Sequence, residues 1–404
     1  MAGSSFGTIF RVSTWGESHG KALGVVIDGC PAGIPLDEGA FADAMARRRP
    51  GQTKYATPRS EADEVEILSG VFEGLTTGTP ISLMIRNTSQ RSADYSEVAN
   101  YYRPGHADYG FDVKYGFRDY RGGGRSSGRE TTARVAAGVV AERFLDALGI
   151  RTTAYVKQIG PHICEKNVYT PGERLETGEL VGWYVPDRET IEASPLRMPD
   201  PEISGKAEEY LTSCMNEGDS SGGLIECIVA GMPAGVGDPV FDKLDALLGQ
   251  AIFSIGAVKG VEIGAGFSVV EMKGSENNDG FMPENPTHDI RLTRRSRTSD
   301  GPDRAVPLAI KTSNAAGGIL GGISDGADIV LRAAFKPTPS ISREQQTLNK
   351  QGESVTVSVK GRHDPIIAPR AVVVVESMVN LVLADRLLVG MGAQIEGVKH
   401  FYRR

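Results

Sequence analysis

The chain has 404 residues, of which 40% are hydrophobic and 24% are charged, and its net charge is −7. This acidic balance argues against nucleic acid or an anionic membrane surface as the main partner. No stretch reaches the roughly 18 uninterrupted apolar residues of a membrane span. The four cysteines form no CxxC pair, and the N-terminus lacks a signal-peptide pattern. We therefore expect a cytoplasmic protein with reduced thiols.

A repeated pattern of turn, strand, turn and helix divides the chain. It starts at residues 16–20 in one copy and at residues 218–222 in the other, and both copies continue through a Gly-x-Pro-Ala-Gly turn. Such self-similarity indicates a duplicated unit. We expect one domain over residues 1–404, made of halves 1–155 and 200–404 that are related by a pseudo-twofold axis. Residues 156–203 are predicted to be a surface excursion.

The predicted strands mostly alternate apolar and polar residues, as at 81–85 and 355–359. Alternation indicates sheets with one buried face, and hence antiparallel pairing. The predicted helices are rich in alanine and valine, which suits close packing. The simplest assembly is an α+β fold, a β-α-β sandwich with two antiparallel sheets around a central helical layer. Residues 274–307 are polar and are predicted to form a long loop.

The most specific motif is the turn at residues 122–132, which precedes an apolar helix. Ser127 and Glu130 have the spacing of a capping box. The helix should then direct free N–H groups and its positive dipole end at the turn. Three glycines allow close approach of a ligand, and Arg125 and Arg129 add positive charge, so the segment predicts an anion site. The alternative is an ordinary capped helix with surface arginines.

Two further basic clusters could contribute to the same site. Residues 47–54 contain several cations, although cations at a helix C-terminus also have a structural explanation. The second cluster combines one lysine and two hydroxyl groups on a proline-stiffened turn: Lys336, Pro337, Thr338, Pro339 and Ser340.

Two histidines, His19 and His106, lie in glycine-flanked turns. The repeat places Ser221 opposite His19, which marks His19 as the chemical member of the pair. Imidazolium can protonate a departing phosphate near neutral pH. Asp364 could act as a base or as a proton relay, or simply form an ion pair with Arg362. No histidine or carboxylate group has metal-ligand spacing, so we expect no catalytic metal.

The sequence resembles the chorismate synthase family over residues 7–388. Four motifs carry the resemblance: Gly16-Glu17-Ser18-His19-Gly20, residues 122–134, residues 313–318 and Arg362-His363-Asp364-Pro365. The resemblance implies a 1,4-anti elimination of phosphate from 5-enolpyruvylshikimate 3-phosphate to give chorismate, the seventh step of the shikimate pathway to aromatic amino acids. It also implies reduced FMN as cofactor and a homotetramer with the layered fold described above.

The resemblance further implies roles for individual residues. His19 would protonate the leaving phosphate, His106 would protonate or stabilise reduced flavin, and Asp364 would assist proton removal from the ring. The substrate anions would be bound by Arg48, Arg49, Lys54, Arg129 and Arg362. The flavin would be surrounded by Arg125, Ser126, Ser127, Gly256, Ala257, Gly321, Lys336, Pro337, Thr338, Pro339, Ser340 and Arg362.

Three departures and two alternatives accompany this interpretation. Lys54 stands where many relatives have arginine, Gly256 stands where many have asparagine, and the loop at 274–307 is longer and more basic than in many members. The chain could be a non-catalytic anion-binding protein, although His19 and His106 argue against that, or a reduced-flavin lyase with another phosphorylated cyclic acid as substrate. An external reductant or reductase is expected, and reduction of the flavin by NADPH on this chain stays open.

Overall fold

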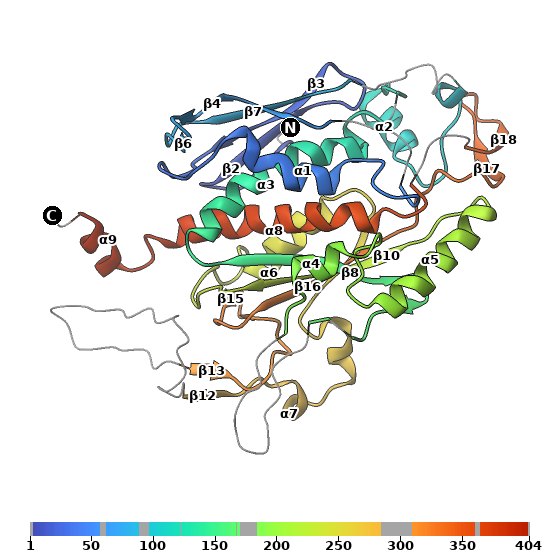
Figure 1. The fold of residues 1–404 in the computed structure, drawn as a ribbon. Helices are drawn as coiled ribbons and strands as arrows, with labels where there is room; N and C mark the ends of the chain where they lie inside the picture. Colours follow the sequence, from blue (N-terminus) through green and yellow to red (C-terminus); the bar gives the residue numbers. More distant parts are fainter. Residues whose placement is uncertain are drawn as a thin grey trace.

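A computed structural model describes residues 3–56, 62–88, 97–121, 123–166, 168–169, 184–283, 309–359 and 364–402. Within these ranges the chain forms two five-stranded sheets with helices lying between them (Figure 1). The predicted α+β class is confirmed. No helix in the described part of the chain is both long and apolar enough to cross a bilayer.

The first sheet contains strands from the N-terminal part of the chain. Its order is β1 (Ser5–Phe6), β2 (Arg11–Gly16), β3 (Ala22–Asp28), β7 (Ile81–Arg86) and β4 (Val65–Ser69), and all neighbours are antiparallel. Alternate residues of β7 are fully buried, namely Ile81, Leu83 and Ile85. They share one face because side chains alternate along a strand. The predicted strand at 81–85 is therefore confirmed.

The second sheet is also antiparallel throughout. Its order is β11 (Val258–Ile263), β16 (Ile329–Phe335), β10 (Gly223–Ala230), β8 (Arg151–Ile159) and β9 (His162–Ile163). The predicted strand at 355–359 belongs to neither sheet. Instead β18 (Ser354–Val357) forms a separate hairpin with β17 (Gln345–Leu348).

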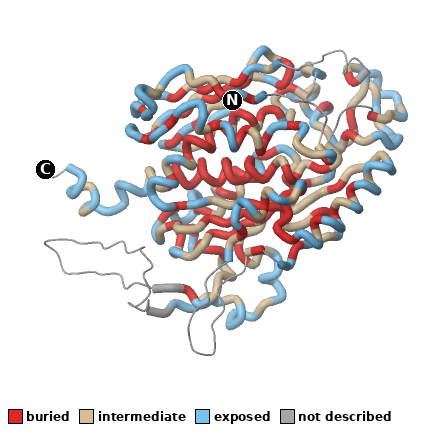
Figure 2. Tube along the Cα trace, viewed as in Figure 1, coloured by how far each residue is buried: buried red, intermediate tan, exposed pale blue. Residues whose placement is uncertain are grey.

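Two long helices occupy the space between the sheets. α3 (Thr131–Asp146) contacts β3 and β7 of the first sheet, and α8 (Ala368–Gly390) contacts β8 and β10 of the second. The two helices pack against each other and are buried along most of their length (Figure 2). Gly138 lies at their crossing, where an added Cβ would overlap the side chain of Ser377. Glycine is therefore what permits this close approach.

Shorter elements complete the described chain. The remaining α-helices are α1 (Ala42–Arg48), α2 (Asp108–Tyr115), α4 (Arg188–Glu192), α5 (Pro201–Asn216), α6 (Leu244–Phe253), α7 (Gly274–Asn277) and α9 (Ile395–Tyr402). The remaining strands form hairpins between β5 (Val71–Phe72) and β6 (Leu75–Thr76), β12 (Phe281–Pro283) and β13 (Ala309–Lys311), and β14 (Ile319–Leu320) and β15 (Ile323–Ser324).

Two sequence predictions about loops need correction. Residues 156–203 are not only a surface excursion, because β8 continues to Ile159 and because Leu196 and Met198 are almost completely buried in the core. Residues 274–307 are not a simple loop, because they begin with α7 and β12. The rest of that stretch, residues 284–308, lies outside the described residues.

Candidate functional site

The turn before α3 lies against the end of α1. Arg48, the last residue of α1, donates from Nε to Thr131 Oγ1 at 3.2 Å and from Nη2 to the carbonyl oxygen of Gly128 at 2.8 Å. Arg370, in the first turn of α8, donates from Nε to the carbonyl oxygen of Arg48 at 3.3 Å. α3 and α8 therefore both begin beside Arg48. Their positive dipole ends favour an anion at this place.

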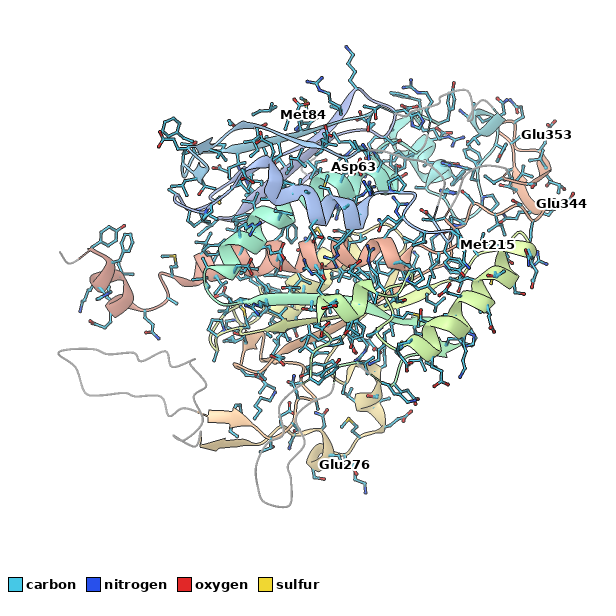
Figure 3. The ribbon with its side chains drawn as sticks, viewed as in Figure 1. Asp63, Met84, Met215, Glu276, Glu344 and Glu353 are labelled. Atoms are coloured by element: carbon cyan, nitrogen blue, oxygen red, sulfur yellow. The ribbon has the colours of Figure 1, made fainter. Side chains whose placement is uncertain are left out.

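Asp63 joins two of the predicted substrate-binding arginines. Its Oδ2 accepts from Arg48 Nη1 at 3.0 Å, and its Oδ1 accepts from Arg129 Nη1. The Asp63 side chain is 0% exposed, and it lies beneath the first sheet (Figure 3). Burial raises its pKa, but the charges of Arg48 and Arg129 outweigh that effect and hold the pKa below its usual value.

The same cluster holds an excess of positive charge. Burial and the like charge of Arg370 lower the pKa of Arg48 to about 9, although Asp63 opposes the shift. Arg48 still remains charged near neutral pH. Asp63 also has a φ of 55°, which for a residue other than glycine costs about 1–2 kcal/mol. We call Arg48, Asp63, Asn87, Arg129 and Arg370 the arginine cluster.

A hydrogen-bonded chain connects the arginine cluster to the turn that carries His19. Arg129 Nε donates to Asn87 Oδ1 at 2.9 Å. Asn87 Nδ2 in turn donates to the carbonyl oxygens of Glu17 at 3.1 Å and Gly20 at 2.9 Å. The position of the His19 turn therefore depends on Asn87, and that of Asn87 on Arg129.

His19 follows β2 and is only 7% exposed. Its Nδ1 lies 3.0 Å from Ser18 Oγ, which restrains the rotation of the ring. Asp119 is close enough to be affected electrostatically. Its pKa is lowered first by the hydrogen bond from Arg121 and also by His19. An imidazole in this setting can take part in proton transfer at the edge of the arginine cluster.

The predicted capping box is wrong. α3 begins at Thr131, and Ser127 Oγ accepts from the backbone N–H of Arg129 at 3.3 Å. The Glu130 carboxylate accepts from Arg134 Nε at 2.5 and 3.0 Å instead of reaching back to the cap. A guanidinium one helical turn away is a stronger partner for a carboxylate than a backbone N–H.

Arg125 and Ser126 fix the shape of the turn. Arg125 donates from Nη1 to the carbonyl oxygen of Gly16 at 3.0 Å and from Nη2 to Thr14 Oγ1 at 2.6 Å. Ser126 Oγ donates to the carbonyl oxygen of Gly123 at 2.7 Å. The Arg125 side chain thus ties the turn to β2, the strand that leads to His19.

His106 lies with several predicted flavin-binding residues. Its Nε2 is 2.7 Å from Ser340 Oγ, and Lys336 Nζ donates to the carbonyl oxygen of Gly105 at 2.6 Å. The backbone N–H of Lys336 donates to the carbonyl oxygen of Ala257 at 2.9 Å. The structure therefore brings together His106, Ala257 and the turn at 336–340, which we call the histidine–lysine group.

Two contacts join the start of α3 to segments that adjoin the histidine–lysine group. A Cβ added at Gly123 would lie 3.8 Å from Nη2 of Arg103, which is three residues before His106. On another side, Arg134 Nη1 donates to Ser254 Oγ at 2.6 Å, shortly before Ala257. The turn at 123–129 and the first turns of α3 therefore contact segments next to His106 and Ala257.

Some predicted site residues lie elsewhere. The Lys54 side chain is 70% exposed, 3.7 Å from Glu208, and Arg49 is exposed after the end of α1. Gly321 lies in the β14–β15 hairpin, which precedes β16, whereas Lys336 follows it. β16 itself, seven residues and about 20 Å long, lies between them in the chain.

The predicted ion pair between Asp364 and Arg362 stays a prediction, and the structure adds a second arginine beside Asp364. Asp364 forms an ion pair with Nη1 of Arg370, while Arg362 lies outside the described residues. The pair joins the Asp364 turn to the arginine cluster. Sequence reasoning did not single out Asp63, Asn87 or Arg370, since an isolated aspartate, asparagine or arginine forms no motif. The one available signal was Arg370 in the first turn of a predicted helix.

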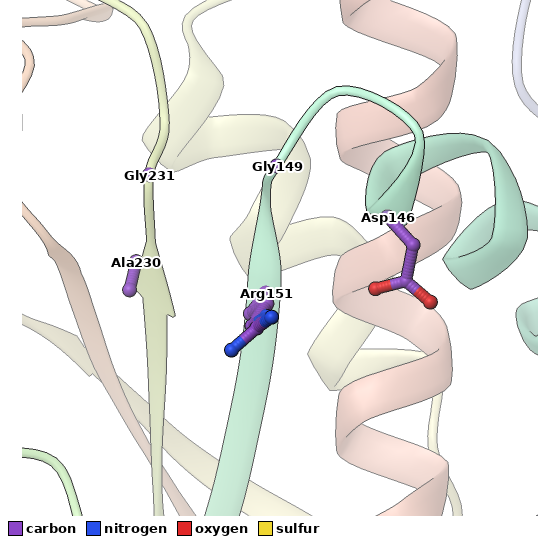
Figure 4. A pocket seen from close by; sticks show the side chains of 5 residues that line it. All are labelled: Asp146, Gly149, Arg151, Ala230 and Gly231. Carbon is purple, nitrogen blue, oxygen red and sulfur yellow. The ribbon is translucent and has the colours of Figure 1, made fainter. Parts of the chain in front are cut away.

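A surface hollow of about 530 Å³ lies away from these residues. It is lined by Asp146, Gly149, Arg151, Ala230 and Gly231 (Figure 4). Asp146 ends α3, whereas the arginine cluster lies where α3 begins. The 16 residues of this helix span about 24 Å. The hollow contains no predicted site residue and is not the candidate site.

Comparisons with known proteins agree with the resemblance seen in the sequence. The sequence profile of the chorismate synthase family matches residues 10–388. The chain is 58% identical to chorismate synthase of Lachnoclostridium phytofermentans and 55% identical to that of Lachnospira eligens, each over 100% of both chains. A crystal structure of chorismate synthase superposes with a TM-score of 0.70 at 31% identity, covering 98% of this chain and 96% of the other. The chain therefore belongs to the chorismate synthase family, carbon–oxygen lyases that form chorismate at the end of the shikimate pathway.

Proposed function

We propose that this chain eliminates phosphate from 5-enolpyruvylshikimate 3-phosphate in a 1,4-anti sense, with reduced FMN as cofactor. The observation that carries the proposal is the convergence of two helix N-termini, buried arginines and His19 on one place. A substrate with a phosphate and carboxylates complements this positive charge. Arg129 is the proposed substrate anchor, and Arg48 supports the turn that carries it.

His19 is the proposed general acid for the departing phosphate. Its ring is largely buried and restrained by Ser18, so a proton on it can be directed at a bound leaving group. His106 is the proposed proton donor to the reduced cofactor and is held by Ser340. Asp364 is the proposed acceptor of the ring proton, with Arg370 fixing its carboxylate. The candidate site would thus supply acid, base and anion binding from separate residues.

The histidine–lysine group fits an anionic cofactor such as FMN. Burial and the nearby positive charge of Lys259 lower the pKa of Lys336, and two adjacent lysines suit a phosphate. Ala257 has a φ of 74°, a strained turn of the kind found beside ligands. The members of the family need reduced flavin, which when bound supplies the electrons that help to expel phosphate. This chain's own residues hold and orient that group.

We also propose an internal pseudo-twofold repeat with a sandwich of layers. Strand order supports it, because β2-β3-β7-β4 in the first sheet parallels β8-β10-β16-β11 in the second. Helices α1 and α3 of one half likewise correspond to α6 and α8 of the other. The active site would then lie where the halves meet.

A homotetramer, a cytoplasmic location and an external flavin reductant follow as proposals from the family resemblance. Large exposed apolar side chains on and beside α2 support association between copies, among them Tyr109, Val113 and Phe117. Gly321 precedes β16 and Lys336 follows it, so a contact of Gly321 with flavin from a neighbouring copy would be consistent with a homotetramer. Use of NADPH by this chain can be tested by adding oxidised FMN and NADPH without a reductase.

The decisive experiment is anaerobic incubation of the protein with 5-enolpyruvylshikimate 3-phosphate and reduced FMN. We expect chorismate and phosphate in equal amounts, and no product without reduced flavin. Phosphate release without chorismate would indicate a different lyase reaction. Substrate binding without any turnover would indicate a non-catalytic binding protein.

The proposed proton-transfer roles can be tested with His19→Ala and His106→Ala. Each change should slow turnover by about ten- to a thousandfold, as expected for loss of a general acid, while substrate binding is largely retained. His400→Ala is a matched control, since His400 is exposed on α9. Native turnover in both test variants would rule out the mechanism.

A further inference from the structure

We propose that Asp63 is a positioning residue for the elimination, which holds the Arg129 guanidinium in the orientation that binds the substrate. This inference rests on the proposed function, because it assigns the geometry of that same site. Nothing in the sequence motifs marks Asp63, and its carboxylate is too deeply buried to contact solvent. It acts through the arginines that it joins.

The Asp63 carboxylate is held in place by Arg48, because the Arg48 guanidinium is itself restrained by other acceptors. Arg48 bonds to Asp63 with Nη1, while its Nε and Nη2 are held by Thr131 and by the carbonyl oxygen of Gly128. Both of these acceptors belong to the start of α3. Because Oδ2 of Asp63 is bound to Arg48, its Oδ1 has a restrained position from which it accepts a hydrogen bond from Arg129 Nη1.

Arg129 is held from two sides. Asp63 accepts from its Nη1, and Asn87 accepts from its Nε at 2.9 Å. Two acceptors at different nitrogens fix the plane of a guanidinium as well as its position. Since Asn87 also holds the carbonyl oxygens of Glu17 and Gly20, an Arg129 that rotates would loosen the turn that carries His19.

Charge and backbone conformation both indicate that Asp63 serves the arginines. It is the shared carboxylate between Arg48 and Arg129, and Arg370 is paired with Asp364. Removal of the Asp63 charge would leave two buried guanidinium groups repelling each other beside two positive helix ends. The left-handed backbone at Asp63 is a strained conformation, and such strain persists where the surroundings enforce it.

Kinetics of Asp63→Asn test the proposal. The amide keeps the shape but loses the charge and turns a donor toward one arginine. We expect the KM for 5-enolpyruvylshikimate 3-phosphate to rise about 30-fold because substrate anchoring is lost, while kcat falls less than about fivefold because Asn87 still holds the His19 turn. The matched control is Asp385→Asn, a buried aspartate paired with Arg386 near the far end of α8. It should lower thermal stability and leave KM unchanged.

A double-mutant cycle identifies the residue through which Asp63 acts. If Asp63 works through Arg129, then Asp63→Asn combined with Arg129→Lys should be at most about threefold worse in kcat/KM than Arg129→Lys alone. Multiplication of the two single effects would overturn the proposal. So would an unchanged KM in Asp63→Asn, or an equal rise of KM in Asp385→Asn.

A second variant covers the case in which Asp63→Asn does not fold. Asp63→Glu keeps the charge but displaces the carboxylate by one methylene, so KM should rise about three- to tenfold if position matters. A folded Asp63→Glu protein with native KM would contradict the proposal. The native enzyme separates this test from the proposed function: failure to form chorismate rejects the function, whereas an active native enzyme with insensitive Asp63 variants rejects only this inference.

Discussion

The two ends of the helical layer manage buried charge differently. Where α3 and α8 begin, Arg48 and Arg129 both pair with the carboxylate of Asp63, and the pKa of Arg48 falls to about 9 through burial and its like-charged neighbours. Near the other end of α8, Arg386 pairs with Asp385 at 2.6 Å. Two more aspartates, Asp242 and Asp238, lie 3.6 and 3.9 Å from the same guanidinium.

The end around Asp63 has the charge arrangement of a binding site, whereas the end around Asp385 and Arg386 is a structural joint. At the first end, positive side chains face the positive ends of two helices, an arrangement that an anionic ligand stabilises. At the second end, a cation faces the negative end of α8 and is matched by carboxylates. Asp385 also accepts from the backbone N–H groups of Thr8, Ile9 and Phe10. Asp385 at the joint thus fixes the backbone of residues 8–10, whereas Asp63 at the site fixes arginine side chains that can bind a ligand.

The largest expected effect is a loss of activity from a change where α3 and α8 begin. Arg129→Lys should lower kcat/KM about 100-fold, or about 2.7 kcal/mol, because one ammonium group cannot bond to both Asp63 and Asn87. Anaerobic steady-state kinetics measure the change. Arg386→Lys is the control and should stay within about twofold of native kcat/KM. Equal losses in both variants would mean that the two ends do not differ in function.

The next effect lies at the structural joint. Asp385→Asn should destabilise the protein by about 2–3 kcal/mol, because a buried arginine and three backbone N–H groups lose a charged acceptor. Urea unfolding followed by circular dichroism measures this change. We expect unaltered kcat/KM per folded molecule. Native stability in this variant would contradict a structural role for the joint.

A smaller effect concerns acid stability near His106. Burial raises the pKa of Asp108, but Arg103 and Arg118 outweigh it and lower the pKa to about 2. Because the folded-state value is depressed, the stabilisation is present above the unfolded value near 4 and is lost as pH falls toward 2. Asp108→Asn should remove about 1–2 kcal/mol of stability at neutral pH and flatten the decline between about pH 4 and pH 2. Unfolding curves across this range would show an unchanged slope if the pair contributes nothing.

The smallest effect tests whether the substrate site extends as far as Lys54. Lys54 is exposed and pairs with Glu208 at 3.7 Å, and surface pairs of this kind contribute little. Lys54→Ala should therefore change KM for the substrate less than about twofold. A tenfold rise in KM would extend the substrate site outward to Lys54, as the family resemblance implies.

Much of the fold could be predicted from the sequence because it depends on local pattern. The alternation at 81–85 predicted a half-buried strand, and the apolar runs before residues 148 and 388 predicted the helices that became α3 and α8. The alternation at 355–359 predicted a strand but could not reveal its partner. Within the described residues β18 pairs with β17, because pairing depends on which segments the chain brings together.

The candidate site was predictable where its residues form motifs. His19, His106, Arg129 and the turn at 336–340 stand out among glycine, serine and proline. The capping box was wrong because Arg134, one helical turn further along, binds Glu130 more strongly. Asp63 and Asn87 were missed because their importance comes from partners 15 to 70 residues away in sequence.

The run Arg47-Arg48-Arg49 shows what the sequence determined and what the tertiary structure decided. The sequence by itself determined a basic end of a helix and, through its motifs, the family. In the folded chain the three arginines have different surroundings. Arg47 pairs with Glu192 and Glu376, Arg48 binds Asp63 and the carbonyl oxygen of Gly128, and Arg49 is exposed. Successive helical residues point about 100° apart, so neighbours in sequence meet different partners. Which of them joins the site depends on the elements packed around α1.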